Sequence, residues 1–355
     1  MMPSHSSNID SAAIASSPVS NSPARKKILI IRFSSIGDIV LTTPVIRCIH
    51  NQVPGAEIHF LSKHAFRAVL ENHPYITRHF YLQHSCQLLI HQLKEEQYDF
   101  IIDLHHNLRS FRIKQALRSV PHASFNKLNV QKWLLTSIKI NVLPDVHIVD
   151  RYLATAAALG VVNDGAGLDF FISDAQRVKS TDIPVSHSAG YIALVIGAAH
   201  ATKQLPLEQL KLLCSLIPHP IILLGGKQER ALGDEIASVD TVKVYNAAGK
   251  FSLHESADLL RNAKLLITPD TGLMHIAAAL KKKMISIWGS TVPAFGMTPY
   301  YGNTAVSHRI FQVPQLSCRP CSKIGFDKCP KKHFNCMNQI NMQEVAFAAM
   351  EMIAS

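Results

Sequence analysis

The sequence predicts an α/β protein with two doubly wound domains that face each other across a central cleft. Short apolar segments alternate with helical apolar periodicity, which is typical of parallel sheets covered by helices on both faces. This alternation stops once, between residues 173 and 188, where Ser, Asp, Lys and Pro dominate, and then begins again. A chain of 355 residues, 47% of them hydrophobic, has enough length and apolar material for two cores.

The first half opens with an isoleucine-rich run. Lys26–Phe33 reads KKILIIRF, as expected of a strand buried on both faces. Further strands are expected at Glu57–Leu61 and Tyr98–Leu104, and helices at residues 40–49, 65–70, 88–93 and 144–159. We therefore expect a Rossmann-like domain over residues 26–180. Residues 1–25, rich in Ser, Pro, Asn and Ala, are expected to form a disordered tail without the features of a secretory signal.

The second half repeats the pattern after the polar segment, which we interpret as the hinge. Strands are expected at Tyr191–Ile196, Pro220–Leu224, Val242–Tyr245, Lys264–Ile267 and Met284–Trp288, with helices at 206–216, 231–237 and 253–260 and a helix after Asp270. These elements define a second Rossmann-like domain over residues 190–340, followed by a C-terminal helix at 341–355. Ligands of such folds bind where strand C-termini and helix N-termini face the cleft.

The composition narrows the class of partner. The formal net charge is +11, with Lys and Arg dispersed along the chain. This charge favours an anionic ligand but does not identify which one. Aromatic residues are sparse and not interleaved with the basic ones, so nucleic acid is not an expected partner. No apolar stretch reaches the ~20 residues needed to span a bilayer, and a cytoplasmic protein is expected.

The segment Ile267–His275 (ITPDTGLMH) combines a strand end, a tight turn and a helix start. Asp270 or Thr271 can cap the helix, and Gly272 allows a ligand to approach the backbone closely. Free N–H groups and the helix dipole favour a phosphate there, with His275 as an additional donor. An ordinary helix cap with a satisfied histidine explains this segment equally well when it is considered alone.

Two further loops occupy matching positions after strands. Lys203 follows the first strand of the second half, among small residues and before a helix that starts at a proline. Asp38 follows the first strand of the first half, where a carboxylate can act as a general base; a solvated lysine and an N-cap aspartate are the plain alternatives. Neither a P-loop GxxxxGK[ST] nor a GxGxxG after the first strand is present, which argues against P-loop and NAD enzymes.

Together these loops resemble those of the heptosyltransferase family, glycosyltransferases of the lipopolysaccharide core with the two-domain GT-B architecture. The resemblance depends on R-x-S-x-x-G-D at Arg32–Asp38, the Lys203 loop, and D-T-G-x-x-H-x-A at Asp270–Ala277. It extends from Lys26 to nearly the end of the chain. The resemblance implies inverting, metal-independent transfer of a heptose or related sugar from an ADP-sugar to a lipopolysaccharide core or other surface glycolipid, without a cofactor.

The resemblance also implies a role for each loop. Asp38 would be the catalytic base, and Lys203 would stabilise the leaving diphosphate. The other donor-binding positions would be Asp270, the N–H groups of Thr271, Gly272 and Leu273, the supporting His275, Glu229 at the ribose and Phe251 at the adenine.

The chain departs from the family pattern in two places. Leu205 stands where the family often has tryptophan, and Asp103-Leu-His-His-Asn stands where the family tends to show D-L-x-G. We expect Arg109, Arg112 and Lys114, which follow this second segment, to face an anionic acceptor. An ordinary basic helix face accounts for them equally well.

A cysteine cluster near the C-terminus is a separate feature. Cys318, Cys321, Cys329 and Cys336, with His333 between the last two, supply enough ligands for a tetrahedral zinc, although the spacing is looser than in a zinc ribbon. A structural loop with reduced thiols fits the sequence as well as a metal-bound one. Neither alternative implies a catalytic metal.

The leading hypothesis is therefore a heptosyltransferase whose partners are a nucleotide-sugar donor, an anionic glycolipid acceptor and the cytoplasmic face of the inner membrane, contacted peripherally. Two other functions are kept open. A nucleotide-sugar epimerase of the same architecture would convert the sugar without an acceptor, and a non-catalytic protein would only bind an anionic ligand.

Overall fold

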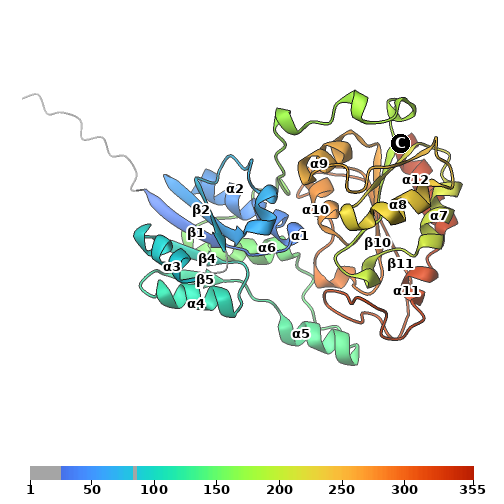
Figure 1. The fold of residues 1–355 in the computed structure, drawn as a ribbon. Helices are drawn as coiled ribbons and strands as arrows, with labels where there is room; N and C mark the ends of the chain where they lie inside the picture. The colour runs from blue at the N-terminus through green and yellow to red at the C-terminus, as the bar shows by residue number, and fades with distance from the viewer. Residues whose placement is uncertain (1–24, 83–85) are drawn as a thin grey trace, which may run out of the picture.

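The computed structural model describes residues 25–82 and 86–355 (Figure 1). It contains two parallel-sheet units side by side, each with helices on both faces of its sheet. The tail expected at 1–25 lies outside the described residues, apart from Arg25. No helix in the described part of the chain is both long and apolar enough to cross a membrane.

The first sheet has the order β3-β2-β1-β4-β5, and all its strands are parallel. Its strands are β1 (Lys26–Ile31), β2 (Ala56–Lys63), β3 (Arg78–Leu82), β4 (Phe100–Asp103) and β5 (His122–Ser124). The helices of this half are α1 (Ile36–Val40), α2 (Thr43–Gln52), α3 (Cys86–Glu95), α4 (Leu108–Ala116), α5 (Asn129–Trp133) and α6 (Ile148–Leu153). The two edge strands β3 and β5 were not predicted, because β3 is mostly half-exposed and β5 has only three residues.

The second sheet has the order β11-β10-β9-β6-β7-β8 and is also entirely parallel. Its strands are β6 (Ile192–Val195), β7 (Ile221–Leu224), β8 (Val244–Asn246), β9 (Leu265–Pro269), β10 (Met284–Trp288) and β11 (His308–Gln312). Its helices are α7 (Leu207–Leu216), α8 (Arg230–Ala237), α9 (Leu253–Asn262), α10 (Gly272–Ala279), α11 (Asn335–Asn338) and α12 (Met342–Ala354). The edge strand β11 was missed because its side chains are largely exposed.

Successive side chains of the central strands point to opposite faces of each sheet, as the two-residue period of a β-strand requires. Ile28 and Ile30 of β1 pack into the core that contains α2, whereas Leu29 and Ile31 pack against α3 and α4. The core on the α2 side continues through α10 into the second sheet without a break. The two units therefore share one apolar interface rather than touching only at a linker.

The polar segment expected to be the hinge contains no strand and only short 3-10 turns: Asp174–Gln176, Ser180–Asp182 and Val185–His187. Strands of the first sheet come from residues 26–124 and those of the second from 192–312, on either side of it. Before this segment the chain is anchored to α2, where Arg47 forms ion pairs with Asp164 and Asp169. The segment is thus a tethered connection across the junction.

Candidate active site

The candidate site lies where the C-terminal ends of the two sheets face each other. In each sheet the strand order reverses once, between β1 and β4 in the first and between β6 and β9 in the second. Such reversal points open a crevice in which ligands of doubly wound folds bind. The loop after β1 carries Asp38, and the loops after β6 and β9 carry Lys203 and Asp270. The sequence-predicted catalytic and donor loops therefore meet at the two crevices.

The residues predicted to bind the donor follow the strands of the second sheet in spatial order. Along this edge, Asp270 follows β9, Lys203 follows β6, Glu229 follows β7 and Phe251 follows β8. Neighbouring parallel strands lie about 4.8 Å apart, so the four positions form a row. Asp270 and Lys203 lie at one end of the row and the Phe251 ring lies at the other. A nucleoside diphosphate has the same order, with its phosphates at one end and its base at the other.

Lys203 forms a short ion pair at the charged end of the row. Its Nζ lies 2.6 Å from Oδ2 of Asp270, and the Thr291 hydroxyl donates to the same oxygen over 2.9 Å. The Lys203 and Asp270 side chains are only 16% and 12% exposed. A mostly buried ammonium group held in this way presents a fixed positive charge to the crevice.

The start of α10 has no side-chain cap. Thr271 occupies the N-cap position, but its side chain makes no capping hydrogen bond, and Asp270 pairs with Lys203 instead. The capping role that the sequence suggested for Asp270 or Thr271 is therefore wrong. The N–H groups at the start of a helix otherwise lack partners, so those of Gly272 and Leu273 are available to an anion.

His275 lies in the first turn of α10, at the junction with the first unit. The side chain is 2% exposed, and its Nδ1 has no hydrogen-bond partner within the described residues. Burial lowers the pKa of His275 to about 4, so the ring is neutral at pH 7. A neutral buried imidazole with one unsatisfied nitrogen is suited to hydrogen bonding with a ligand or a bound water.

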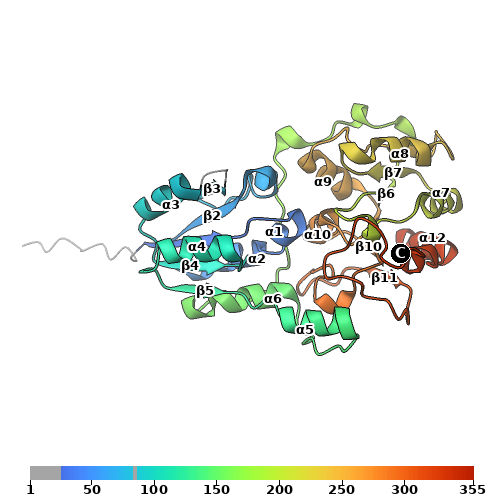
Figure 2. The same ribbon diagram turned by 60° about the horizontal axis from the view of Figure 1, so that its bottom comes forward.

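Helices α1 and α10 lie side by side at the junction of the two units (Figure 2), and each has a glycine at the contact, Gly37 and Gly272. A Cβ added to Gly37 would lie 2.6 Å from Cδ2 of His275, and one added to Gly272 would lie 2.8 Å from Cγ2 of Ile36. Any side chain at either position would push the helices apart. The absence of side chains here brings the Asp38 helix directly against the helix that carries the candidate phosphate site.

This close approach leads to a prediction for Gly37→Ala. The methyl group meets the rigid, buried His275 ring, so α1 must move relative to α10, whereas the helical backbone itself tolerates alanine. We expect kcat for sugar transfer to fall at least about tenfold, since displacements of 1 Å in an active site cost up to about 10²-fold. The melting temperature should also fall, because overpacking a buried contact costs about 1–3 kcal/mol, whereas ADP affinity should change less than kcat. An unchanged kcat would mean that the contact between α1 and α10 does not position the reacting groups.

Asp38 is held in a network at the start of α1. Arg32 Nη2 lies 2.7 Å from its Oδ1, and the N–H and hydroxyl of Ser35 donate to Oδ2 over 3.1 and 2.9 Å. Burial raises the pKa of Asp38, but the Arg32 guanidinium and the Ser35 hydrogen bonds outweigh burial and hold the pKa below its ordinary value. The carboxylate, 21% exposed, is therefore ionised at neutral pH and able to accept a proton.

Arg32 joins this carboxylate to the neighbouring strand. Besides the ion pair, its guanidinium donates to the carbonyl of Leu104 at the end of β4. His105 follows, with its ring 4.9 Å from that of Phe33 and its Nδ1 unpartnered within the described residues. Burial, followed by the charge of Arg32, lowers the pKa of His105 to about 4. A second neutral imidazole therefore lies near Asp38.

Two lysines that the sequence interpretation missed also lie near Asp38. Burial lowers the pKa values of both Lys127 and Lys132, that of Lys132 to about 8. The negative charge of the nearby Asp38 opposes this shift but does not cancel it. Neither ammonium group forms an ion pair with a described residue. They come from the segment after β5, nearly a hundred residues beyond Asp38, so only the folded chain reveals that they belong to the site.

The three residues expected to face the acceptor have different positions. Arg109 and Arg112 are exposed on α4. Lys114 is buried, 3.0 Å from Oδ2 of Asp103 and bonded to the Ser124 hydroxyl, so its assignment to the acceptor is wrong. Asp103 is itself fully buried, and an uncompensated carboxylate there would be costly. Lys114 is thus a structural counter-ion at the end of β4.

Glu229 lies across the glycine loop that follows β6. A Cβ added to Gly197 would lie 2.7 Å from Cδ of Glu229, and the Gly226 N–H donates to Oε2 over 2.8 Å. This leaves Oε1 free of hydrogen bonds from the described residues. Phe251 is half-buried beside the start of α9. Both positions agree with hydrogen bonding to a sugar hydroxyl and packing against a base.

The cysteine loop packs against the Lys203 turn. Thr202 donates its N–H to the carbonyl of Phe326 and accepts the Phe326 N–H with its hydroxyl. Cys318, Cys321, Cys329 and Cys336 are free thiols, and Sγ of Cys318 lies 3.9 Å from Nε2 of His333. Among the described residues, the ligand atoms of this cluster do not converge within 4.8 Å as a group of three. The loop's contacts here support the Lys203 turn.

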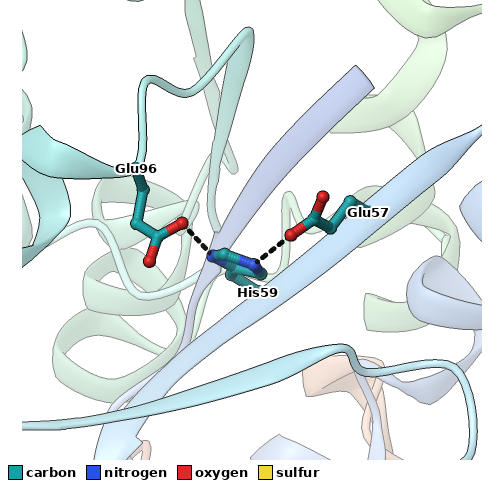
Figure 3. A group of neighbouring side chains, drawn as sticks. All are labelled: Glu57, His59 and Glu96. Atoms are coloured by element: carbon teal, nitrogen blue, oxygen red, sulfur yellow. Dashed lines mark hydrogen bonds and ion pairs between the residues drawn. The ribbon is translucent and has the colours of Figure 1, made fainter. Parts of the chain in front are cut away.

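A separate cluster, away from the candidate site, consists of the buried His59 and the carboxylates of Glu57 and Glu96 (Figure 3). His59 Nε2 lies 3.1 Å from Glu57 Oε1, and its Nδ1 lies 3.0 Å from the Tyr98 hydroxyl. Lys27 lies 2.8 Å from Glu96 and supplies a compensating positive charge. With its polar atoms paired in this way, the group is an ion-pair network that closes the N-terminal end of the sheet, far along β1 from Asp38.

Comparisons with known proteins agree with the fold of two parallel-sheet units. A family model described as glycosyltransferase family 9 (heptosyltransferase) matches residues 87–329. Lipopolysaccharide heptosyltransferase 1 of Campylobacter coli is 28% identical over 301 residues, which cover 78% of this chain and 86% of that protein. The crystal structure of a family 9 glycosyl transferase from Veillonella parvula matches with a TM-score of 0.72 at 20% identity, covering 93% of this chain and 97% of that one. The Escherichia coli heptosyltransferase WaaC, solved with ADP, matches with a TM-score of 0.66 at 20% identity, covering 92% and 99%.

Proposed function

The chain belongs to glycosyltransferase family 9, the heptosyltransferases, and we propose that it moves a heptose from an ADP-sugar to a lipopolysaccharide-core acceptor with inversion and without a metal ion. Its two facing parallel sheets form the GT-B fold. The observation that carries the proposal is the row of donor positions along the second sheet, opposite Asp38 on the first. Curated relatives are lipopolysaccharide heptosyltransferases, which supports the same sugar and acceptor class here.

The donor would lie along the row with its diphosphate at Lys203 and the start of α10. Lys203 and the N–H groups of Thr271, Gly272 and Leu273 would stabilise the charge that develops on the leaving ADP. Glu229 would accept hydrogen bonds from the ribose hydroxyls, and the Phe251 ring would pack against the adenine. The E. coli relative has been solved with ADP, which supports an adenine nucleotide.

Asp38 would act as the base in a single displacement. The acceptor hydroxyl gives its proton to Asp38 as its oxygen bonds to the anomeric carbon, and the bond from that carbon to the diphosphate breaks on the opposite face. Because Arg32 lowers the pKa of Asp38, proton transfer becomes favourable only once the new bond is well advanced. The positive charge of Lys203 and the helix start would take the part that a divalent cation plays in other glycosyltransferases.

The acceptor is proposed to be an anionic glycolipid bound on the first unit. Lys127 and Lys132 carry charges without ion-pair partners in the described part of the chain and lie near Asp38. Acidic sugars or phosphates would supply those partners. Arg109 and Arg112 would contribute from farther along the surface. An enzyme that modifies such a lipid would work in the cytoplasm, in peripheral contact with the inner membrane.

The proposal is tested with purified protein, ADP-heptose and a lipopolysaccharide-core acceptor. We expect ADP release that requires the acceptor, with one heptose added per ADP and an inverted anomeric configuration by NMR. A thermal-shift comparison of ADP, UDP, GDP and CDP should show the largest stabilisation with ADP. Conversion of the free nucleotide sugar without acceptor would identify an epimerase instead. Ligand binding without turnover of any sugar would refute the enzyme assignment at this site.

A further inference from the structure

The segment after β5 exposes an unusual number of apolar side chains. Helix α5 and the π-helical turn Leu134–Ile138 that continues it lie below the junction of the two units, and the chain then runs on without regular structure to Val146 (Figures 1 and 2). Large apolar side chains of this segment are between 42% and 67% exposed: Val130, Trp133, Ile138, Ile140, Val142 and Val146. No other stretch of this length in residues 25–82 and 86–355 exposes as many. Isolated exposed apolar residues are ordinary, but a contiguous group marks an interaction surface.

This apolar surface is surrounded by positive charge. Residues 126–146 contain three lysines, Lys127, Lys132 and Lys139, and one acidic residue, Asp145. The cysteine loop adds exposed Ile324 and Phe326, with exposed lysines at 323 and 328 and an exposed aspartate at 327. Lysines thus outnumber acidic residues by five to two. We call this set, from residues 126–146 and 323–328, the basic apolar patch.

Both parts of the patch are fixed to each other across the two units. Lys139 Nζ donates to the carbonyls of Cys318 and Pro320, over 3.3 and 2.8 Å. Lys323 Nζ lies 3.5 Å from Oδ1 of Asn129. The two segments of the patch are therefore held side by side across the junction of the two units.

The patch also adjoins the reacting groups. Lys132 is next to Trp133 in the chain; burial lowers the pKa of its ammonium group to about 8, and the charge of the Asp38 carboxylate partly opposes this shift. Phe326 is hydrogen-bonded through its backbone to Thr202, one position from Lys203. A lipid seated on the patch would thus have its headgroup next to the crevice.

We infer that the basic apolar patch docks onto an anionic membrane surface, with Trp133 and its apolar neighbours at the headgroup level and the exposed Lys139, Lys323 and Lys328 beside anionic lipid. The inference rests on the proposed function only in that a lipid acceptor gives such docking a purpose. Lysines around an apolar face are the pattern of interfacial membrane binding, and tryptophan favours the membrane–water interface. The patch is not expected to bind a second copy of this chain, because the positive charges of two such patches would repel each other.

The first measurement is co-sedimentation of the full chain with vesicles. Vesicles of phosphatidylcholine alone are compared with vesicles that also contain phosphatidylglycerol, at low and high NaCl. We expect binding only to the anionic vesicles, and weaker binding at high salt. The double variant Trp133→Ser/Ile138→Ser should bind about tenfold more weakly, because it removes two apolar contacts with the lipid. A matched control is Phe347→Ser, which changes an apolar residue on α12 of the second unit that is somewhat more exposed, at 67%.

Tryptophan fluorescence supplies a readout that needs no variant. The chain has two tryptophans, and Trp288 is 1% exposed whereas Trp133 is 57% exposed. Brominated anionic lipids should therefore quench Trp133, and Trp133→Phe should abolish the quenching. Unquenched fluorescence, equal vesicle binding by the double variant, or concentration-dependent dimerisation lost in that variant would each overturn the inference.

Success or failure here is separable from that of the proposed function. Transfer to a water-soluble acceptor without acyl chains should proceed equally in the wild type and in Trp133→Ser/Ile138→Ser. Vesicle binding through Trp133 without heptose transfer would refute only the proposed function. Heptose transfer without vesicle binding would refute only the docking surface.

Discussion

Asp38→Asn is expected to slow sugar transfer about 10³-fold while leaving ADP binding intact, within the range that a general base contributes. Asparagine has the shape of aspartate and can still accept a hydrogen bond from Arg32, so the start of α1 should keep its structure. It cannot take the proton of the acceptor hydroxyl. The loss should therefore fall on kcat, measured with saturating donor and acceptor, rather than on the dissociation constant of ADP.

The control for this variant is Asp174→Asn. Asp174 also pairs with an arginine, but on the surface of the connecting segment, with a side chain that is 87% exposed. We expect it to retain wild-type turnover and stability. Asp38→Glu should recover part of the rate lost in Asp38→Asn, because it restores a carboxylate at a slightly different distance. Turnover of Asp38→Asn within a few-fold of the wild type would exclude Asp38 as the base.

Lys203→Ala should weaken ADP binding and also reduce kcat. Charge-assisted hydrogen bonds contribute about 1.5–3 kcal/mol, which corresponds to a loss of roughly 10- to 150-fold in affinity. The loss in kcat/KM should be larger, because the leaving diphosphate gains charge in the transition state. Isothermal titration with ADP and steady-state kinetics measure the two effects separately. Lys211→Ala, which removes a surface lysine paired with Glu235, should change neither.

The ion pair with Asp270 makes a second, sharper test possible. In Lys203→Ala the Asp270 carboxylate, 12% exposed, loses its cationic partner and would repel the incoming diphosphate. Removing that charge in Lys203→Ala/Asp270→Asn should therefore restore part of the ADP affinity lost in the single variant. Equal or weaker affinity in the double variant would show that Asp270 acts mainly by positioning Thr291 and the turn. Unchanged ADP binding in Lys203→Ala itself would remove Lys203 from the donor site.

Most of the strands that could be predicted from sequence are those buried on both faces. The predicted runs at Lys26–Phe33, Tyr191–Ile196 and Met284–Trp288 overlap β1, β6 and β10, whose side chains are mostly or wholly buried. Continuous apolar runs arise only where both faces of a strand are covered. The edge strands β3, β5 and β11 lack this covering on at least one side, so their sequences contain polar residues that resemble loops.

The loops proposed to hold the catalytic base and to bind the donor were recognisable because each is short and local. A strand end, a glycine turn and a helix start lie within a dozen residues in the Asp38 and Asp270 segments, so neighbouring residues carry the pattern. Lys127 and Lys132 carry no such pattern, since an isolated lysine is usually a solvated one. Lys114 was misassigned for the same reason, because its buried partner Asp103 lies eleven residues away and on another element.

The sequence by itself determined the two parallel-sheet halves, the polar connection between them and the three loops to which we assign the chemistry. Those features depend on apolar periodicity and on turn residues within a few positions of one another. Only the tertiary structure decided which charges are paired, which lysines surround Asp38, how Gly37 and Gly272 bring α1 against α10, and that residues 126–146 and 323–328 form one exposed patch. Strand order, burial and charge pairing depend on contacts between residues tens to hundreds of positions apart, and a single sequence does not encode these contacts as a local pattern.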